Sequence, residues 1–424
     1  MTRGKNPSLR TLLEDGHSLP PTQFSLIRRI ASLAAERGLA LYLVGGFVRD
    51  LLLARPTLDH DFVLEGDAVP FARALVKKFG GRVTTHPAFH TATWFLPSDL
   101  LGEANVPGAF DLISARSETY AHPAALPTVT LGDISDDLRR RDFTINAMSV
   151  RLNDGEFGDL LDPFDGQADL RKGMVRVLHA RSFIDDPTRI FRAVRYAERY
   201  GFKLALQTRE LIPAALKYVD RLSPERLRHE LDLILEEENS SAMLARLANL
   251  GLLAAVKPAL PEFPAERAHW LDHRVPVDFG LTLDRAALGY LLWLMDAPEE
   301  TLASLTDRLG FTAPLTKSVR AAARLKADLP SLEGARPSQW VERLERVPPD
   351  AIYAVRLVTR QEALQDYLLT WRHIYPSITG DDLKARGLPP GPKFKHILTR
   401  LRSAWLDGEV STPKEEEFLL ESLL

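Results

Sequence analysis

Two aspartates separated by one residue are the part of the sequence best suited to metal chemistry. Asp59 and Asp61 flank His60 and open an apolar run, residues 62–64, that predicts a β-strand. Residues i and i+2 of a strand project from the same face, so both carboxylates can bind the same cations while His60 points the other way. Mg²⁺ prefers such hard oxygen ligands and is usually shared between carboxylates and substrate phosphates. The pattern therefore predicts a Mg²⁺ site for phosphoryl-type transfer, with no catalytic role for His60.

A glycine pair upstream of these aspartates is suited to phosphate binding. Residues 39–44 form an apolar run typical of a buried strand, and Gly45 and Gly46 separate it from a helical segment that carries Arg49. Backbone N–H groups at such a turn can point at phosphates, and a guanidinium one turn later can bind them through two hydrogen bonds. The alternative is a tight turn followed by a surface pair of Arg49 with Asp50.

A third carboxylate belongs to a run that predicts a neighbouring strand. Asp111 lies in this run, residues 110–115. We expect Asp111 to join Asp59 and Asp61 as a catalytic residue. The alternative is a solvated aspartate at a strand edge.

The elements that position these residues change in character along the 424-residue chain. Up to about residue 178, short apolar runs alternate with few helices, whereas helical periodicity dominates from residue 183 onward. We therefore predict an α+β fold, in which a small α/β head is followed by a long all-helical body.

Composition excludes several classes of protein. The chain has no cysteine, which rules out disulfides, thiolate metal sites and a cysteine nucleophile. No apolar stretch reaches the roughly 18 residues of a membrane-spanning helix, and the first residues lack the apolar segment of a secretory signal. We therefore expect a cytoplasmic protein without membrane contact. Because the net charge is −3, any contact with nucleic acid must come from a local basic surface.

Five segments in order along the chain resemble the motifs of class II tRNA nucleotidyltransferases and bacterial poly(A) polymerases, of the polymerase-β superfamily. These segments are LVGGFVRDLLL with LDHDFV (43–63), RRDFTINAM (140–148), LLDPFDGQADL (160–170), DDPTRIFRAVRYAERYGF (185–202) and SPERLRHEL (223–231). The fourth motif normally opens with Glu-Asp, and here Asp185 takes the first place. Asp186 and Arg189 keep the D-x-x-R spacing, so the comparison with the family still covers both residues.

The resemblance implies a fold, an activity and partners. The fold would be a five-stranded nucleotidyltransferase sheet followed by helical neck, body and tail. The activity would be Mg²⁺-dependent, template-independent addition of C and/or A from CTP and ATP to the 3′ end of tRNA. Poly(A) addition to RNA 3′ ends, a catalytically silent RNA-binding protein and transfer to a small molecule are the alternatives. The implied segments are 1–38 (arm and helix), 39–180 (catalytic head), 181–257 (neck) and 258–424 (body and tail).

The resemblance also assigns roles to residues. Asp59 and Asp61 would bind the catalytic metals, and Asp186 and Arg189 would read the incoming base. Residues three apart share a helix face, so Asp186 can accept from an exocyclic amine while Arg189 donates to ring positions. The alternative is an ordinary ion pair between the two.

Further nucleotide contacts are expected from two motifs. Arg141, Asp142 and Asn146 have the character of a ribose and phosphate clamp, and Arg192 and Arg195 continue the Arg189 face towards the triphosphate. Asp142 would alternatively cap a helix at the Thr144 and Ile145 amides, and the arginines would alternatively extend from a core helix to solvent.

A basic cluster on a late helix is the expected RNA contact. It consists of Lys393, Lys395, Arg400 and Arg402. Contacts of this kind with phosphates position RNA without reading its sequence, and a solvated helix face is the alternative. The sequence leaves open the choice among CCA, CC-only, A-only and poly(A) addition, and the oligomeric state.

Overall fold

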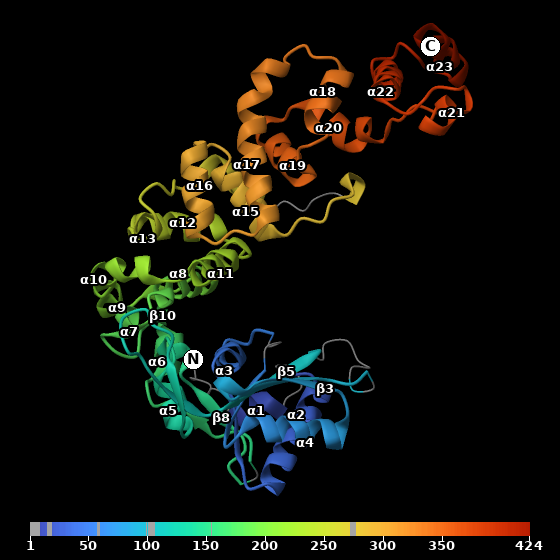
Figure 1. Cartoon of the computed structure of the whole chain (residues 1–424). Coiled ribbons are helices and arrows are strands. Elements are labelled where there is room, and N and C mark those ends of the chain that lie inside the picture. Colours follow the sequence, from blue (N-terminus) through green and yellow to red (C-terminus); the bar gives the residue numbers. More distant parts are fainter. Residues whose placement is uncertain are drawn as a thin grey trace, which may run out of the picture. The chain divides into compact units, whose positions relative to one another are not determined.

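The computed structural model describes residues 9–14, 19–56, 60–98, 100, 107–153, 155–271 and 277–424. These residues divide into two compact units, an N-terminal unit (Met1–Leu222) and a C-terminal unit (Ser223–Leu424), shown in Figure 1. The boundaries at 38, 180 and 257 stay a prediction. None of the described helices combines the length and apolarity needed to span a bilayer.

A mixed sheet forms the centre of the N-terminal unit. Its order is β3-β4-β5-β2-β1-β8-β9, and β2 and β5 are parallel whereas the other neighbours are antiparallel. The strands are β1 (Ala40–Val44), β2 (Asp61–Glu65), β3 (Arg82–His86), β4 (Thr91–Phe95), β5 (Ala109–Ser114), β8 (Ser149–Arg151) and β9 (Leu160–Leu161). The expectation of five strands is therefore too low, because the β3–β4 hairpin and the short β9 extend the two edges.

Three helices pack on or beside this sheet: α2 (Pro21–Glu36), α3 (Gly46–Leu52) and α4 (Ala68–Phe79). The bounds of α4 follow from local chemistry, because Asp67 accepts from the Val69 amide at 3.0 Å and Gly80 ends the helix at φ 81°. His60 is buried between the rings of Phe47 and Phe110, with centroids at 4.9 and 5.2 Å. It therefore lies in the core, as expected from strand alternation.

The N-terminal unit contains further short elements besides this sheet and its three helices. They are α1 (Leu9–Glu14), η1 (Pro87–Phe89), β6 (Arg116–Thr119), β7 (Thr128–Leu131), α5 (Ile134–Arg139), η2 (Thr144–Asn146), α6 (Gly166–Lys172), β10 (Met174–Val175), α7 (Ser182–Asp185), α8 (Thr188–Tyr200), β11 (Lys203–Leu204), α9 (Leu206–Glu210), α10 (Ile212–Ala215) and η3 (Leu216–Arg221). The chain after residue 183 is not purely helical, contrary to expectation. Strand β11 pairs in parallel with β10, and the Lys203 amide donates to the Gly173 carbonyl at 2.8 Å.

The described residues of the C-terminal unit form helices and no strand. They are α11 (Pro224–Leu235), α12 (Ser240–Asn249), α13 (Leu252–Val256), η4 (Ala265–Arg267), α14 (Ala268–Leu271), η5 (Val277–Phe279), α15 (Arg285–Leu294), α16 (Glu299–Arg308), α17 (Ala313–Asp328), η6 (Leu329–Leu332), α18 (Pro337–Leu344), α19 (Pro349–Thr359), α20 (Glu362–Leu369), η7 (Trp371–His373), α21 (Gly380–Ala385), α22 (Pro392–Leu406) and α23 (Pro413–Leu423). Helix α15 is the core element of this unit and packs against α11, α17 and α19. The last three helices surround a cluster formed by Leu383, Ile397, Leu401 and Leu420 (Figure 1).

Candidate active site

A cavity of about 690 Å³ in the N-terminal unit collects most of the residues selected from the sequence. Its walls come from α3, β2, β5, β6, the segment 140–146 and one side of α8 from Thr188 to Arg199. The predicted site residues in its lining are Gly46, Arg49, Asp61, Arg141, Asp142, Asn146, Asp186, Arg189, Arg192 and Arg195. Segments far apart in the sequence therefore meet around one space large enough for a nucleotide.

Two of the three predicted carboxylates lie on neighbouring strands, and one of them, Asp61, lines this cavity. Asp61 on β2 pairs in register with Asp111 on the parallel strand β5, so both side chains project from the same face of the sheet. Asp111 is exposed and accepts a 2.6 Å hydrogen bond from Thr93 Oγ1. Asp59 lies outside the described residues. Among the residues that are described, no group of three or more acidic, His or Cys side chains is placed to hold a metal ion.

This donor set fits a divalent cation with hard oxygen ligands. Asp61, which lines the cavity, and Asp111, its partner in the β2–β5 register, are adjacent carboxylates, and a cation between such groups removes their mutual repulsion. Because the chain has no cysteine and so offers no thiolate, the donor set suits a hard cation better than a soft metal.

The glycine turn brings the start of α3 to the cavity. Gly45 has φ 63°, in the left-handed region that favours glycine, and a Cβ atom there would lie 2.4 Å from Arg141 Nη1, so the end of that side chain would have to move. The Gly45 amide already donates to the Met148 carbonyl at 3.0 Å. A phosphate would therefore meet this turn on the side of Gly46, which lines the cavity.

Arg49 is held by the protein on several sides. Its side chain is buried, donates through Nε and Nη2 to the two oxygens of Asp50 at 2.9 and 2.8 Å, and donates through Nη1 to Asn146 Oδ1 at 2.6 Å. The rings of Tyr196 and Tyr200 lie 5.2 and 4.8 Å from its guanidinium carbon. Arg49 and Asp50 therefore do form an ion pair, but it is not a simple surface pair, because Arg49 is buried and also bonds Asn146.

Asp142 is the centre of the clamp predicted from the second motif. It accepts hydrogen bonds from Asn146 Nδ2 at 2.9 Å, Arg192 Nε at 2.7 Å and its neighbour's amide, Phe143 N, at 2.8 Å. The alternative of a cap on later amides does not hold, since the Thr144 amide donates to Arg176 O. Burial alone would raise the pKa of Asp142, but the Arg192 charge and the Asn146 hydrogen bond lower it to about 2, so the carboxylate is ionised.

These contacts close into a ring that begins and ends on α8. Arg192 bonds Asp142, Asp142 bonds Asn146, and Asn146 bonds Arg49. Arg49 bonds Asp50, and Tyr200 at the end of α8 donates to Asp50 Oδ1 at 3.0 Å. The ring therefore fixes α3 and η2 against two successive regions of one helix. We call it the α3–α8 ring.

The pair selected for base reading stands at the start of α8. Arg189 lies in the helix, but Asp186 precedes it in an extended conformation, so the expected shared helix face does not form. Asp186 Oδ1 accepts from the Thr188 amide at 3.0 Å and from Thr188 Oγ1 at 2.6 Å. Arg189 is buried and donates to Ser182 Oγ and to the Arg140 carbonyl, both at 2.8 Å. Asp186 and Arg189 thus have separate protein partners that orient them while both line the cavity.

Comparison with known proteins identifies the family. Residues 41–176 match the family described as "Poly A polymerase head domain", and residues 201–263 match "Probable RNA and SrmB- binding site of polymerase A". The chain is 33% identical over 410 residues to an "A-adding tRNA nucleotidyltransferase" of Halalkalibacterium halodurans, covering 94% of this chain and 92% of that protein. This chain belongs to the tRNA nucleotidyltransferase family.

Two further comparisons show how much of other family members this chain matches. An "A-adding tRNA nucleotidyltransferase" of Geobacter sulfurreducens is 34% identical over 428 residues, covering 94% of this chain, which spans about half (47%) of that longer relative. The solved structure "Thermotoga maritima CCA-adding enzyme complexed with tRNA_CCA" superposes with TM-score 0.75 at 29% identity over 99% of both chains. Nucleotidyltransferases of this family are generally metal-dependent, in keeping with the carboxylates at the cavity.

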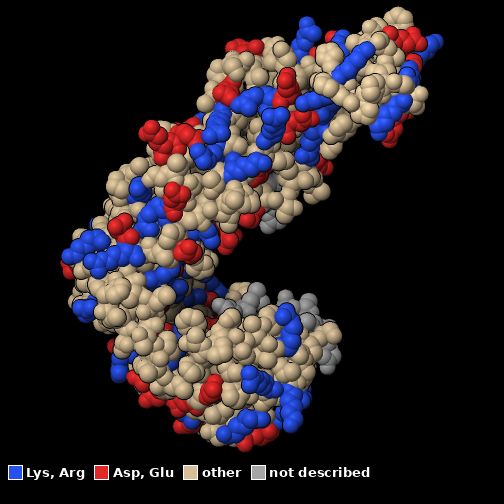
Figure 2. All heavy atoms as spheres, viewed as in Figure 1, with Lys and Arg blue, Asp and Glu red and all other residues tan. Residues whose placement is uncertain are grey.

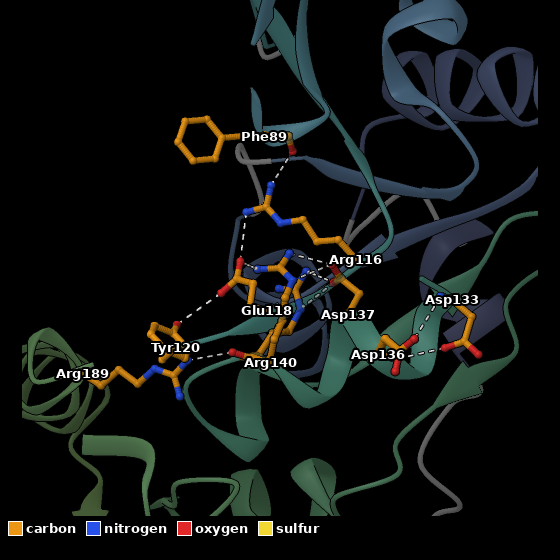
Figure 3. A network of polar contacts seen from close by, with 10 residues as sticks. Phe89, Arg116, Glu118, Tyr120, Asp133, Asp136, Asp137, Arg140 and Arg189 are labelled. Atoms are coloured by element: carbon orange, nitrogen blue, oxygen red, sulfur yellow. Dashed lines mark hydrogen bonds and ion pairs between the residues drawn. The ribbon is translucent and has the colours of Figure 1, made fainter. Parts of the chain in front are cut away.

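Sequence reasoning missed one wall of the cavity, formed by strand β6 and Tyr120 just after it (Figure 3). Glu118 accepts from Arg116 Nη2 at 3.1 Å, from Arg140 Nη1 at 3.0 Å and from the Tyr120 hydroxyl at 3.3 Å. Burial raises the pKa of Tyr120 to about 12, so its hydroxyl stays protonated. The signal was available, because Arg116, Glu118 and Tyr120 alternate as residues of one strand face do.

The same wall positions the two arginines of the second motif. Asp137 is buried and accepts from both Arg140 and Arg141. Burial raises the pKa of Asp137, but the charges of Arg141 and Arg140 outweigh it and lower the pKa overall. Arg140 in turn presents its backbone carbonyl to Arg189 (Figure 3). The hairpin, α5 and α8 are therefore linked by charge-assisted hydrogen bonds.

The remaining arginines of α8 surround one aromatic ring. The guanidinium carbons of Arg192, Arg195 and Arg199 lie 5.7, 5.2 and 6.0 Å from the Tyr196 ring. Arg195 is buried, and all three line the cavity. They face the cavity and do not extend from a core helix into solvent, which makes them suitable partners for phosphate oxygens.

The basic cluster on α22 has protein partners of its own. Lys393 Nζ donates to the Leu424 carbonyl at 2.9 Å, Arg400 pairs with Glu409 at 2.5 Å, and Arg402 donates to the Ile374 carbonyl at 3.0 Å. Lys395 is exposed. Contact of this cluster with RNA stays a prediction.

Proposed function

We propose that the protein transfers nucleotides from ATP, CTP or both to the 3′ end of tRNA and releases pyrophosphate. The observation that carries the proposal is the single cavity in which Asp61, the clamp around Asp142 and the Asp186–Arg189 pair meet. An acidic edge, a set of arginines and a hydrogen-bonding pair match the three parts of a nucleoside triphosphate reaction: the reacting phosphate, the leaving pyrophosphate and the base.

The proposed roles follow from where each group lies. Asp61, Asp111 and Asp59 would hold Mg²⁺, which when bound neutralises charge on the attacking and leaving oxygens. Arg192 and Arg195, beside Tyr196 on α8, would bind the triphosphate. Asp142 and Asn146 would position the ribose.

Base selection is assigned to Asp186 and Arg189. A carboxylate accepts from the exocyclic amine of cytosine or adenine, and a guanidinium donates to their ring nitrogen or carbonyl. Uracil and guanine present the opposite pattern at the same edge, so the pair favours C and A. Because Thr188 and Ser182 hold these side chains in place, the pair discriminates without a template strand.

Addition of A is the activity to test first. The two relatives reported above carry the name A-adding, and the chain covers nearly the full length of one of them. The solved structure described as CCA-adding keeps addition of C within the proposal. Because tRNA and nucleoside triphosphates are found in the cytoplasm, we infer that the protein acts there.

One assay tests the proposal. Purified protein is given tRNA transcripts that end before CCA, after C, after CC or after CCA, with each labelled nucleoside triphosphate supplied separately. We expect label from ATP on the transcript ending in CC, and label from CTP on shorter ends if the protein also adds C. Binding of tRNA without any incorporation in the presence of Mg²⁺ would identify a silent RNA-binding protein and overturn the proposal. Repeated A addition would identify a poly(A) polymerase.

A further inference from the structure

The sheet of the N-terminal unit continues beyond the catalytic carboxylates on a partly exposed face. A single row of paired residues crosses four strands in the order Asp61, Asp111, Thr93 and Thr84. Directly paired residues project from one face of a sheet, so these side chains share it. Asp111 and Thr84 are exposed, whereas Phe110, which points the other way, is buried. We call this side of β3, β4 and β5 the open sheet face.

The order of the strands places the open sheet face on one side of Asp61 and the phosphate-binding groups on the other. Strands β5, β4 and β3 lie to one side of β2, whereas β1, which runs into the Gly46 turn, and β8, which follows Asn146, lie to the other. The attacking and leaving oxygens of phosphoryl transfer lie roughly in line, on opposite sides of the reacting phosphate. With the triphosphate on the β1 side, the attacking hydroxyl therefore approaches from the open sheet face.

One aromatic side chain stands where this face meets the cavity. Phe89, at the end of η1 and two residues before β4, is 49% exposed. Its carbonyl accepts a hydrogen bond from Arg116 Nη1 at 2.6 Å, and Arg116 lines the cavity. In Figure 3 the Phe89 ring points away from this hydrogen bond. The ring therefore lies at the rim of the cavity, with about half of its surface exposed.

The turn that carries Phe89 is fixed by the protein. Exposed apolar side chains are common, so exposure alone indicates no function. Here, however, the His90 amide donates to the Pro87 carbonyl at 3.1 Å, and the His90 carbonyl accepts from the Ser114 amide at 3.0 Å. His90 has φ 51°, a left-handed conformation that persists in a non-glycine residue only where its surroundings hold it. The turn therefore presents a rigid aromatic surface, which loses little entropy when a ligand binds.

The surroundings of this ring suit a base better than a phosphate. The open sheet face next to the cavity carries Thr91, Thr93 and Ile113, and the neighbouring Asp111 carboxylate repels phosphate. In Figure 2 the visible surface is largely tan where Figure 1 places β5, and Lys and Arg side chains gather where it places α4. Aromatic rings bind single-stranded RNA by stacking on its bases.

We propose that Phe89 stacks on the terminal base of the RNA whose 3′ hydroxyl is extended. The inference rests on the proposed function, since it takes an RNA 3′ end as the nucleophile. The stack positions the sugar of that nucleotide towards Asp111 and Asp61. It has no part in the choice of the incoming nucleotide, which is assigned above to Asp186 and Arg189. Because every base has a flat aromatic face, Phe89 accepts either C or A at the growing end.

The test is a thermodynamic cycle between the Phe89 ring and the terminal base. The parent and Phe89→Ala are titrated, without nucleoside triphosphate, with a tRNA ending in CC and with the same tRNA carrying an abasic terminal nucleotide. We expect Phe89→Ala to bind the intact tRNA about 5- to 150-fold more weakly than the parent does. Both proteins should bind the abasic tRNA equally, because it offers no base to stack on.

Turnover and two further variants make the result specific. The KM of Phe89→Ala for tRNA should rise, while its KM for ATP and its preference among nucleotides stay as in the parent. Phe89→Trp keeps an aromatic surface and should restore both binding and turnover. Phe418→Ala is the matched control, since Phe418 is 78% exposed on α23 of the C-terminal unit. Any change in its affinity should be the same for the intact and the abasic tRNA.

Three outcomes would overturn the proposal. Unchanged binding of Phe89→Ala to the intact tRNA would show that the ring makes no contact with the RNA. An equal loss of affinity for both tRNAs would assign Phe89 a structural role. A higher KM for ATP at unchanged tRNA affinity would place the ring against the incoming nucleotide.

Failure of this proposal and failure of the proposed function give different results. If the parent incorporates nucleotides and the cycle shows no coupling, only the role of Phe89 falls. If the loss of affinity depends on the terminal base but the parent incorporates nothing, only the proposed activity falls.

Discussion

The cavity of the N-terminal unit and a cavity of about 530 Å³ in the C-terminal unit are both lined by arginines, yet the two units hold them differently. Arg49 and Arg189 are 4% and 5% exposed and have defined hydrogen-bond partners in the protein. In the C-terminal cavity, the side chains of Arg324 and Arg343 are 63% and 41% exposed, and their ion pairs face solvent. Fixed, desolvated donors can discriminate between ligands, whereas exposed cations attract any backbone phosphate.

Removing the acidic edge of the cavity should have the largest effect. Asp61→Asn keeps the shape of the side chain and removes one carboxylate that faces Asp111. Because metal-assisted charge stabilisation supplies several kcal/mol, we expect incorporation to fall about 10³-fold or more. Single-turnover incorporation and tRNA binding measure the two properties separately. We expect the same of Asp59→Asn.

The matching control for Asp61→Asn is Glu36→Gln, which removes an exposed carboxylate paired with Lys78. It should leave incorporation unchanged. Substantial turnover by both Asp59→Asn and Asp61→Asn with Mg²⁺ present would contradict the metal assignment.

Loss of one member of the base-reading pair should change selectivity more than rate. Asp186→Ala or Arg189→Ala removes a bidentate contact worth about 1–3 kcal/mol of discrimination, or roughly 5- to 150-fold. We expect UTP and GTP incorporation to rise relative to ATP and CTP. Competition assays with paired nucleotides measure this ratio. Parental selectivity together with a lower free energy of unfolding would instead assign the pair a structural role.

The buried clamp should also make stability depend on pH. The pKa of Asp142 is lowered to about 2 in the folded protein, below its value in the unfolded chain. Its contribution is therefore present above about pH 4 and is lost as the pH falls towards 2, and it amounts to about 2 kcal/mol. Urea unfolding of Asp142→Asn should show this loss at pH 7 and a shallower decline than the parent between about pH 4 and pH 2. A decline as steep as the parent's would assign the acid sensitivity to other groups.

Removing one hydrogen bond of the α3–α8 ring should have a smaller effect on nucleotide binding. Tyr200→Phe removes only the hydroxyl that bonds Asp50, which is worth about 0.5–1.5 kcal/mol. Because Asp50 then holds Arg49 less firmly, we expect KM for the nucleotide to rise about two- to tenfold at unchanged tRNA affinity. Tyr353→Phe is the matched control, since the buried Tyr353 hydroxyl has no hydrogen-bond partner among the described residues. An equal change of the nucleotide KM in both variants would contradict a positioning role for Tyr200.

The α22 cluster should show the smallest effect. Lys393, Arg400 and Arg402 already donate to protein oxygens, which leaves Lys395 as the residue to test. Lys395→Gln should lower the salt-dependence slope for tRNA by about 0.7–0.9 if this helix contacts one phosphate. An unchanged slope and unchanged tRNA affinity would contradict a phosphate contact at Lys395.

The sequence by itself determined the parts of this protein that depend on local order. A strand places residues on alternating faces, so Asp61 and His60 point to opposite sides whatever the strand pairs with. The D-x-x-R spacing kept Asp186 and Arg189 within one short segment, and a positive φ at Gly45 favours glycine. The motifs therefore identified the family and most of the cavity lining.

Only the tertiary structure decided which of these faces meet. The parallel pairing of β2 with β5 brings Asp111 beside Asp61, and chain folding brings Tyr200 to Asp50, 150 residues away in sequence. The order of the strands and the extra strands at the sheet edges depend on how much apolar surface the whole core buries. Contacts between segments far apart in the chain leave no regular period in the sequence, so no single segment predicts them.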